Sequence, residues 1–193
     1  MRESSSAHLR VGSAEAMRRV GAALGAALTE AASEPVVVAM EGELGAGKTT
    51  LTAGVLAAMG VAGPIRSPTY TLIEPYEVSG RRVFHIDLYR LADPQEVEAL
   101  GLRDLLIGPS VLLIEWPSRG AGALPTPDLA IHLTYEAAGP ADPDHRPDAA
   151  APPASGGEPG DGRWMRVTAH SPSGARLLAA LLAMEPELSD VSS

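Results

Sequence analysis

The chain has no cysteine, one lysine and few aromatic residues. The absence of cysteine excludes a disulfide, a thiolate metal site and a thiol nucleophile anywhere in the 193 residues. Aromatic residues make up 4% of the chain and hydrophobic residues 45%, so the core must consist mainly of Ala, Val, Leu and Ile. Basic clusters are also missing, and the net charge of −9 disfavours direct, high-affinity binding to nucleic acid.

Long apolar runs are absent as well. The N-terminal residues lack the apolar core of a signal peptide, and no segment approaches the length of a membrane span. These absences predict a cytoplasmic protein with no membrane partner. The length predicts one domain over residues 1–193, with a loose N-terminus over 1–12, a disordered insertion rich in Pro, Gly and Asp over 138–162 and a loose tail over 185–193.

The single lysine, Lys48, lies in the most informative segment of the chain. Residues 42–49 read Gly-Glu-Leu-Gly-Ala-Gly-Lys-Thr and match the phosphate-loop pattern G-x-x-x-x-G-K-[ST] at every fixed position. An apolar run over 36–40 precedes this segment and a helix-compatible run over 50–59 follows it, so a chance glycine-rich turn is the weaker explanation. Backbone N–H groups at such a helix start bind phosphate, the lysine reaches the β- and γ-phosphates, and the Thr49 hydroxyl binds Mg²⁺. The predicted nucleotide site comprises Gly42, Glu43, Leu44, Gly45, Ala46, Gly47, Lys48, Thr49 and Thr50.

The hydrophobic pattern along the chain predicts alternating helices and strands. Helical spacing and capping residues predict helices over 13–32, 50–59, 94–101 and 172–184. Apolar or alternating runs predict strands over 35–41, 70–78, 81–87, 111–114, 129–135 and 164–169, with Ser79 and Gly80 forming a hairpin turn.

Two acids stand at the ends of apolar strands. Asp87 follows the run over 83–86, and Glu115 follows the run over 111–114. In an open parallel sheet the carboxyl ends of strands face the ligand crevice, so both acids could approach Thr49 and a bound metal. Either acid alone could be an ordinary surface residue, but two of them in a chain with a phosphate loop favour a functional role.

Two further features leave alternatives open. The segment Ser-Pro-Thr-Tyr over 67–70 lies where several phosphate-loop enzymes keep a mobile segment that senses the γ-phosphate, or it is an ordinary loop that enters a strand. His85 shares a strand face with Asp87 because side chains alternate with period two. It is either a partner of the site or, as such histidines more often are, a packing residue.

Four segments in order carry a resemblance to a known family. They are the extended phosphate loop over 42–50, Ser-Pro-Thr-Tyr over 67–70, His-Ile-Asp-Leu-Tyr-Arg-Leu over 85–91 and Ile-Glu-Trp-Pro over 114–117. With these segments the chain resembles the TsaE family, also called YjeE, the bacterial ATPases of tRNA threonylcarbamoyladenosine synthesis. The match runs from about residue 13 to residue 135 and resumes at residue 163.

The resemblance implies a fold, two ligands and a set of roles. The fold is an α/β P-loop NTPase-like three-layer sandwich with a mixed, mostly parallel central sheet, and the ligands are ATP and Mg²⁺. Thr49 and Glu115 lie at the metal, and Trp116 lies near the nucleotide. The implied catalytic residues are Asp87, which is needed for hydrolysis, Lys48, and Thr69 on a switch-like segment.

The resemblance also implies protein partners. In the TsaE family, a larger complex of TsaD with TsaB transfers the threonylcarbamoyl group to adenosine 37 of tRNAs that read codons beginning with A. ATP binding and hydrolysis support repeated turnover of that complex, and tRNA is reached only through it. The acidic charge of the chain agrees with a partner that works through protein contacts.

Two departures from the family pattern limit this transfer of roles. Family members usually have a threonine in the first helix near the adenine, where this chain has Met17, so that contact is not carried over. The insertion over 138–162 is longer and richer in proline than the family connection. It leaves open whether Arg163 or Arg166 flanks the nucleotide.

Other nucleotide-binding classes fit less well. A small GTPase needs an Asn-Lys-x-Asp type motif, which cannot occur because Lys48 is the only lysine. A P-loop small-molecule kinase, the alternative function, usually has a lid with several arginines, whereas the predicted flexible segment holds only Arg146, with Arg163 just after it. The intact Lys48, Thr49, Asp87 and Glu115 argue against a degenerate binding module.

Overall fold

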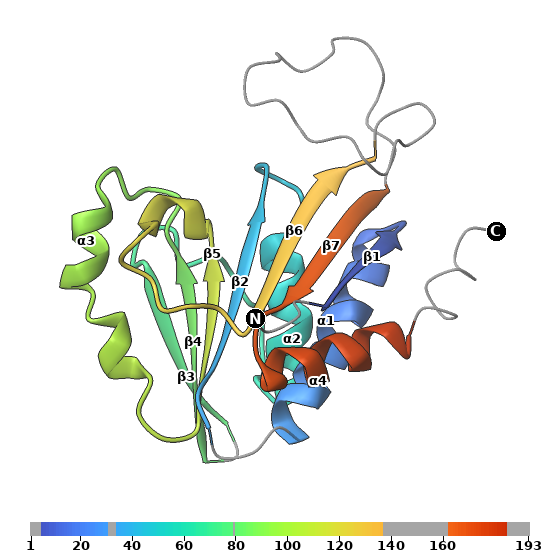
Figure 1. Cartoon of the computed structure of the whole chain (residues 1–193), viewed down its shortest axis with the longest axis horizontal. Helices are drawn as coiled ribbons and strands as arrows, with labels where there is room; N and C mark the ends of the chain where they lie inside the picture. The colour runs from blue at the N-terminus through green and yellow to red at the C-terminus, as the bar shows by residue number, and fades with distance from the viewer. Residues whose placement is uncertain (1–4, 31–33, 79, 137–161, 185–193) are drawn as a thin grey trace, which may run out of the picture.

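The computed structural model of the chain describes residues 5–30, 34–78, 80–136 and 162–184 (Figure 1). The predicted insertion over 138–162 lies outside these ranges except for Gly162, and the predicted tail over 185–193 lies outside them entirely. Within the described ranges, no helix combines the length and the apolar character needed to cross a membrane.

The described strands form one seven-stranded sheet in the order β1-β7-β6-β2-β5-β4-β3. The four central strands are parallel to one another, and the pairs β4–β3, β6–β7 and β7–β1 are antiparallel. Of the described strands, β3 and β7 alone run against the others, which confirms a mixed, mostly parallel sheet. The strands are β1 (Ser5–Val11), β2 (Val36–Gly42), β3 (Ile73–Val78), β4 (Arg81–Asp87), β5 (Ser110–Glu115), β6 (Leu129–Tyr135) and β7 (Arg163–Ala169).

Helices cover both faces of the sheet and complete a three-layer sandwich (Figure 1). One face packs against α1 (Ala14–Glu30), α2 (Lys48–Met59) and α4 (Pro172–Leu182). The other packs against α3 (Pro94–Ala99) and the short helix η1 (Leu102–Leu105), with η2 (Pro117–Gly120) following β5. This arrangement confirms the predicted α/β three-layer architecture.

Strand alternation divides the side chains of the central sheet between two cores. On β5, Val111 and Leu113 join the core under α1 and α2, whereas Leu112 and Ile114 join the core under α3. Every residue of β5 is buried because both faces of the strand are covered. The same alternation places Glu115, at the end of β5, on the α2 face.

The expectation of a loose N-terminus over 1–12 is wrong for residues 5–11. These residues form β1, which pairs along its whole length with β7 and buries Leu9 and Val11 in the core. The partner strand lies near the other end of the sequence, so the local composition gave no sign of the pairing.

The strand expected over 70–78 begins only at Ile73. The residues before it make a turn in which the Leu72 N–H donates to the Pro68 carbonyl at 2.7 Å. Leu72 has a φ of 63°, a left-handed conformation that a leucine rarely adopts. That conformation separates the segment over 67–72 from the strand that follows it.

Helices α1 and α2 pack with their backbones in contact. A Cβ atom built on Gly21 would lie 2.3 Å from the Leu51 carbonyl oxygen, and one on Gly54 would lie 2.3 Å from that of Arg18. These glycines are therefore required by close approach, and the helix that follows the phosphate loop is fixed against α1.

Candidate functional site

The candidate site lies where β2, β4 and β5 end, at the start of α2. The phosphate loop connects β2 to α2, and Gly47 caps the helix in a left-handed conformation with a φ of 107°. No side chain among the described residues caps α2, so the first N–H groups of the helix are left for a ligand. Gly42, with a φ of 147°, passes so close to β6 that a Cβ atom would lie 2.5 Å from the Leu133 carbonyl oxygen.

The Lys48 side chain is folded into the loop. Its Nζ donates to the carbonyl oxygens of Gly42 at 2.6 Å and Glu43 at 2.9 Å, and lies 3.8 Å from the centroid of the Trp116 ring. Burial lowers the pKa of Lys48 from its ordinary value, and the nearby carboxylates of Glu115, Glu41 and Asp87 oppose that shift. The ammonium group is thus held among carbonyls and an aromatic face, next to the free end of α2.

Thr49 and Glu115 meet beside the loop. The Thr49 hydroxyl lies 3.0 Å from each of the two carboxylate oxygens of Glu115. Both are oxygen ligands of the kind that Mg²⁺ prefers. No group of three or more His, Cys, Asp and Glu side chains within the described ranges could hold a metal by itself. The pair could therefore supply oxygen ligands to a Mg²⁺ ion whose remaining ligands come from elsewhere.

Asp87 receives three hydrogen bonds at the end of β4. The hydroxyls of Ser67 and Thr69 both donate to Oδ2, the latter at 3.1 Å, and the Tyr89 N–H donates to Oδ1 at 2.9 Å. Asp87 is opposite Glu115 in the β4–β5 register, so the two acids predicted from strand ends lie side by side. The segment over 67–70 is more than an ordinary loop, because its hydroxyls hold this carboxylate.

Trp116 has an unusual backbone conformation for a bulky residue. Its φ is 59°, and its N–H donates to the Met40 carbonyl at 3.1 Å. The ring lies on Lys48 on one side and 5.0 Å from the Tyr89 ring on another. Such a strained conformation persists only where its surroundings fix it, as the hydrogen bond to β2 and the two ring contacts do here.

Tyr135, at the end of β6, contacts the phosphate loop, and the sequence did not predict this contact. Its hydroxyl donates to the Leu44 carbonyl at 2.8 Å, and the Arg163 guanidinium lies 4.4 Å from the centroid of its ring. The position of Tyr135 at the end of a predicted strand could have indicated this contact. Strand β6 is parallel to β2, so its last residue reaches the edge of the sheet where the loop begins. Of the two arginines left open, Arg163 contacts this tyrosine, whereas Arg166 lies opposite His132 in the β6–β7 ladder.

His85 is a second residue whose role the sequence left open. It is fully buried, and its Nε2 lies 2.7 Å from Glu115 Oε1. The ring is therefore packed in the core and also contacts one of the two strand-end acids. Met17, by contrast, is buried beneath Gly47 and brings no polar group to the site.

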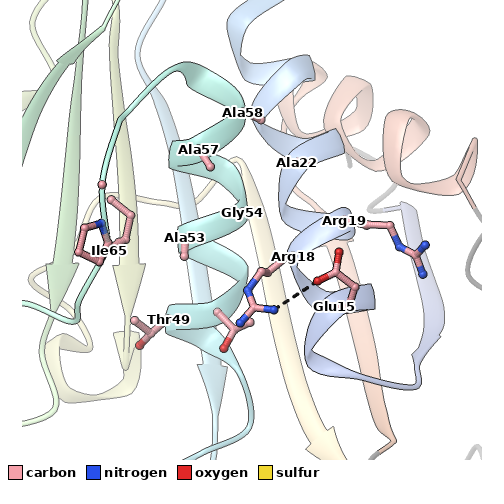
Figure 2. A pocket seen from close by; sticks show the side chains of 13 residues that line it. Glu15, Arg18, Arg19, Ala22, Thr49, Ala53, Gly54, Ala57, Ala58 and Ile65 are labelled. Atoms are coloured by element: carbon pink, nitrogen blue, oxygen red, sulfur yellow. Dashed lines mark hydrogen bonds and ion pairs between the residues drawn. The ribbon is translucent and has the colours of Figure 1, made fainter.

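A groove of about 580 Å³ flanks the site between α1, α2 and the residues over 63–65 (Figure 2). Thr49 and Thr50 line one part of it. On the α1 side, Arg18 contacts Glu15 at 3.4 Å. The Thr49 side chain is thus shared between this groove and the contact with Glu115.

Comparisons with known proteins agree on one family. A family model described as "Threonylcarbamoyl adenosine biosynthesis protein TsaE" matches residues 11–141. Three relatives carry the name tRNA threonylcarbamoyladenosine biosynthesis protein TsaE. The Haemophilus influenzae protein is 49% identical over 52% of this chain and 63% of its own length. The Nostoc sp. protein is 40% identical over 58% of this chain and 70% of its own length. The Treponema pallidum protein is 36% identical over 66% of this chain and 90% of its own length.

The aligned region thus spans less than two thirds of the Haemophilus influenzae protein. The crystal structure of YdiB from Bacillus subtilis matches with a TM-score of 0.64 and 24% identity, over 100% of both chains. At that identity the likeness concerns the fold alone.

Proposed function

The chain belongs to the TsaE family of threonylcarbamoyl adenosine biosynthesis proteins, and we propose that it binds ATP with Mg²⁺ and hydrolyses it in support of tRNA threonylcarbamoyladenosine synthesis. The observation that carries the proposal is the meeting of three groups at the end of β2, β4 and β5. These are the Lys48 ammonium, the Thr49–Glu115 pair and the Asp87 carboxylate with its two hydroxyl donors.

In this proposal the phosphates lie against the loop at the start of α2. The backbone N–H groups and Lys48 would bind them, with the lysine exchanging its carbonyl partners for phosphate oxygens. Thr49 and Glu115 would hold Mg²⁺, which neutralises charge on the phosphates. Because Lys48 is buried, its attraction to phosphate is screened less than that of a surface lysine.

Asp87 is proposed to orient the attacking water. Hydrolysis forms a bond between the water oxygen and the γ-phosphorus and breaks the bond to the bridging oxygen, giving ADP and phosphate. Asp87 is the acid that contacts the segment over 67–70, and the Ser67 and Thr69 hydroxyls keep its Oδ2 directed toward that segment. A water bound there would be positioned by a carboxylate and by hydroxyls together.

The proposed partners are a TsaD-like and a TsaB-like protein, with tRNA reached only through them. The support is family membership, together with a net charge of −9 that is unsuited to direct contact with nucleic acid. Hydrolysis by this chain would support repeated turnover of that complex.

The first test is phosphate release by the purified chain from ATP, with Mg²⁺ and with EDTA, in the absence of any acceptor. Mg²⁺-dependent release supports the ATPase and counts against a small-molecule kinase, which needs an acceptor. A pull-down from lysate with and without ATP then tests the partners. Failure to bind ATP would overturn the proposal, and a complex lacking TsaD-like and TsaB-like proteins would overturn its pathway.

A further inference from the structure

His85 and Glu115 form a buried pair behind the Thr49 hydroxyl. The histidine side chain is 0% exposed and the glutamate side chain 2% exposed, and Nε2 lies 2.7 Å from Oε1. We propose that His85 is a positioning residue, which holds the Glu115 carboxylate in the orientation needed to bind Mg²⁺ with Thr49. This inference rests on the proposed Mg²⁺-dependent nucleotide site and assigns to it a residue beyond the loop and the two strand-end acids.

The strand geometry brings the pair together. Residues 83, 85 and 87 of β4 share one face of the sheet, and Val83 belongs to the core under α1 and α2. Val111 and Leu113 of β5 belong to the same core, so Glu115 projects from that face too. His85 is opposite Leu113 in the parallel register, one pair before Ile86 and Ile114. It therefore lies just below the carboxylate, on the side covered by α2.

The hydrogen-bond partners indicate which ring nitrogen carries the proton. The Nδ1 atom of His85 is buried and has no hydrogen-bond partner within the described residues. A proton on Nδ1 would leave an unpaired donor in the core, which is costly. A proton on Nε2 instead donates to Glu115 Oε1, and Nδ1 is left as a bare acceptor. His85 thus donates from Nε2 to one oxygen of the carboxylate.

This hydrogen bond restricts how the carboxylate can turn. A carboxylate that ends a side chain rotates easily about its last bond, and burial makes any unpaired orientation unfavourable. With Oε1 held by His85, rotation that would carry the carboxylate away from the Thr49 hydroxyl breaks a buried, charge-assisted hydrogen bond. Partners that orient metal ligands in this way typically change metal affinity by about tenfold to a hundredfold.

A purely structural role for His85 predicts something different. A packing residue can be replaced by another side chain of similar volume without changing how the site responds to Mg²⁺. A positioning residue can be replaced only by one that still donates to Oε1. The test therefore compares two variants. His85→Leu fills the volume of the ring without a hydrogen-bond donor, and His85→Gln has an amide that places a donor near the position of Nε2. His85→Asn is a second variant without a donor at Oε1, because its amide lies on a shorter side chain. It serves as the test if the leucine variant does not fold.

The experiment measures ADP affinity by isothermal titration calorimetry across a Mg²⁺ series and in EDTA. We expect His85→Leu and His85→Asn to raise the Mg²⁺ concentration at half-effect by about tenfold or more. His85→Gln should stay within about threefold of the wild type. In EDTA, the wild type and all of the His85 variants should bind ADP with the same affinity. Phe84→Leu is the matched control, because Phe84 is the neighbouring core residue on the opposite face of β4 and should leave the Mg²⁺ response unchanged.

Three results would overturn the inference: an unchanged Mg²⁺ response in the donor-deficient variants, an equal shift in His85→Gln, or an equal shift in Phe84→Leu. A wild type that binds ADP with no response to Mg²⁺ would instead overturn the proposed metal site itself, and the inference with it. The two failures are therefore told apart by the wild-type titration alone.

Discussion

Thr49 and Glu115 face each other at 3.0 Å, with the threonine hydroxyl equally close to both carboxylate oxygens. One residue comes from the first turn of α2 and the other from the end of β5, so the contact joins the phosphate loop to the sheet. In the proposed site, these two side chains would together accept a divalent cation.

The first prediction is that Thr49→Val and Glu115→Gln each raise the Mg²⁺ concentration needed for ATP binding. Because both residues act on the same contact, the double variant should lose less ATP-binding free energy than the two single variants lose together. The expected coupling free energy is about 0.5–3 kcal/mol. A double-mutant cycle by calorimetry measures this. Additive effects would mean that the two residues do not share a metal.

The second prediction is that Lys48→Ala abolishes hydrolysis and weakens ATP binding by roughly tenfold to 150-fold, because a charge-assisted hydrogen bond is worth about 1.5–3 kcal/mol. Arg176→Ala, which removes an exposed cation from α4, is the control and should behave as the wild type. Wild-type phosphate release from the Lys48 variant would remove the loop from the proposed site.

Third, Asp87→Asn should keep ATP affinity within about threefold and lose most hydrolysis. Orientation of water acts on the transition state, so turnover falls more than ground-state binding. Calorimetry with a slowly hydrolysed ATP analogue, beside a phosphate-release assay, separates the two effects. The exposed Asp104→Asn is the charge-matched control. Loss of binding together with turnover would make Asp87 a metal or folding residue.

The fourth prediction concerns stability below neutral pH. Burial, helped by Arg166, lowers the pKa of His132 from its ordinary value of 6.5, and Glu41 opposes this only in part. The folded state therefore takes up the proton less readily than the unfolded chain. The stability this provides is complete above pH 6.5 and is lost as the pH falls from there through the lowered folded pKa.

Lowering the pH from about 7.5 to about 5.5 should accordingly lower the Tm of the wild type more than that of His132→Gln. Differential scanning calorimetry at both pH values measures the two decreases. Equal decreases in the two proteins would show that His132 is not a source of the acid sensitivity.

A fifth prediction is that Gly21→Ala lowers the Tm by about 2–12 °C. Overpacking typically costs about 1–3 kcal/mol of stability, and in a chain of this size each kcal/mol lowers the Tm by about 2–4 °C. A Cβ atom at Gly21 would lie 2.3 Å from the Leu51 carbonyl oxygen, and that backbone atom cannot move aside cheaply. At Gly12 nothing lies within 4 Å, so Gly12→Ala is the matched control and should leave the Tm almost unchanged. Similar melting curves for both variants would contradict backbone contact between α1 and α2.

The parts of the fold and site that could be predicted are those with local signals. The phosphate loop is a contiguous motif, and Asp87 and Glu115 follow apolar runs whose ends are visible in the sequence. Strands β4 and β6 were predicted at their observed bounds because their patterns are uninterrupted.

The remaining features depend on which distant segments become neighbours. His85 contacts Glu115 because of the β4–β5 register, and Tyr135 reaches Leu44 because β6 lies beside β2. Neither register can be read from alternation alone, since period two gives a side chain its face but not its partner. The late start of β3 depends on a left-handed leucine, which no local rule anticipates.

The pairing of β1 with β7 has a consequence for synthesis of the chain. Ser5 pairs with Ala169 and Val11 with Arg163, so β1 is synthesised well before the strand with which it pairs. Until then Leu9 and Val11 have no strand beside them, although both end in the core. The closure of such a distant pair is slow compared with local contacts. In vivo, the described sheet is therefore completed only after translation has passed β7, and β1 stays without its partner strand until then.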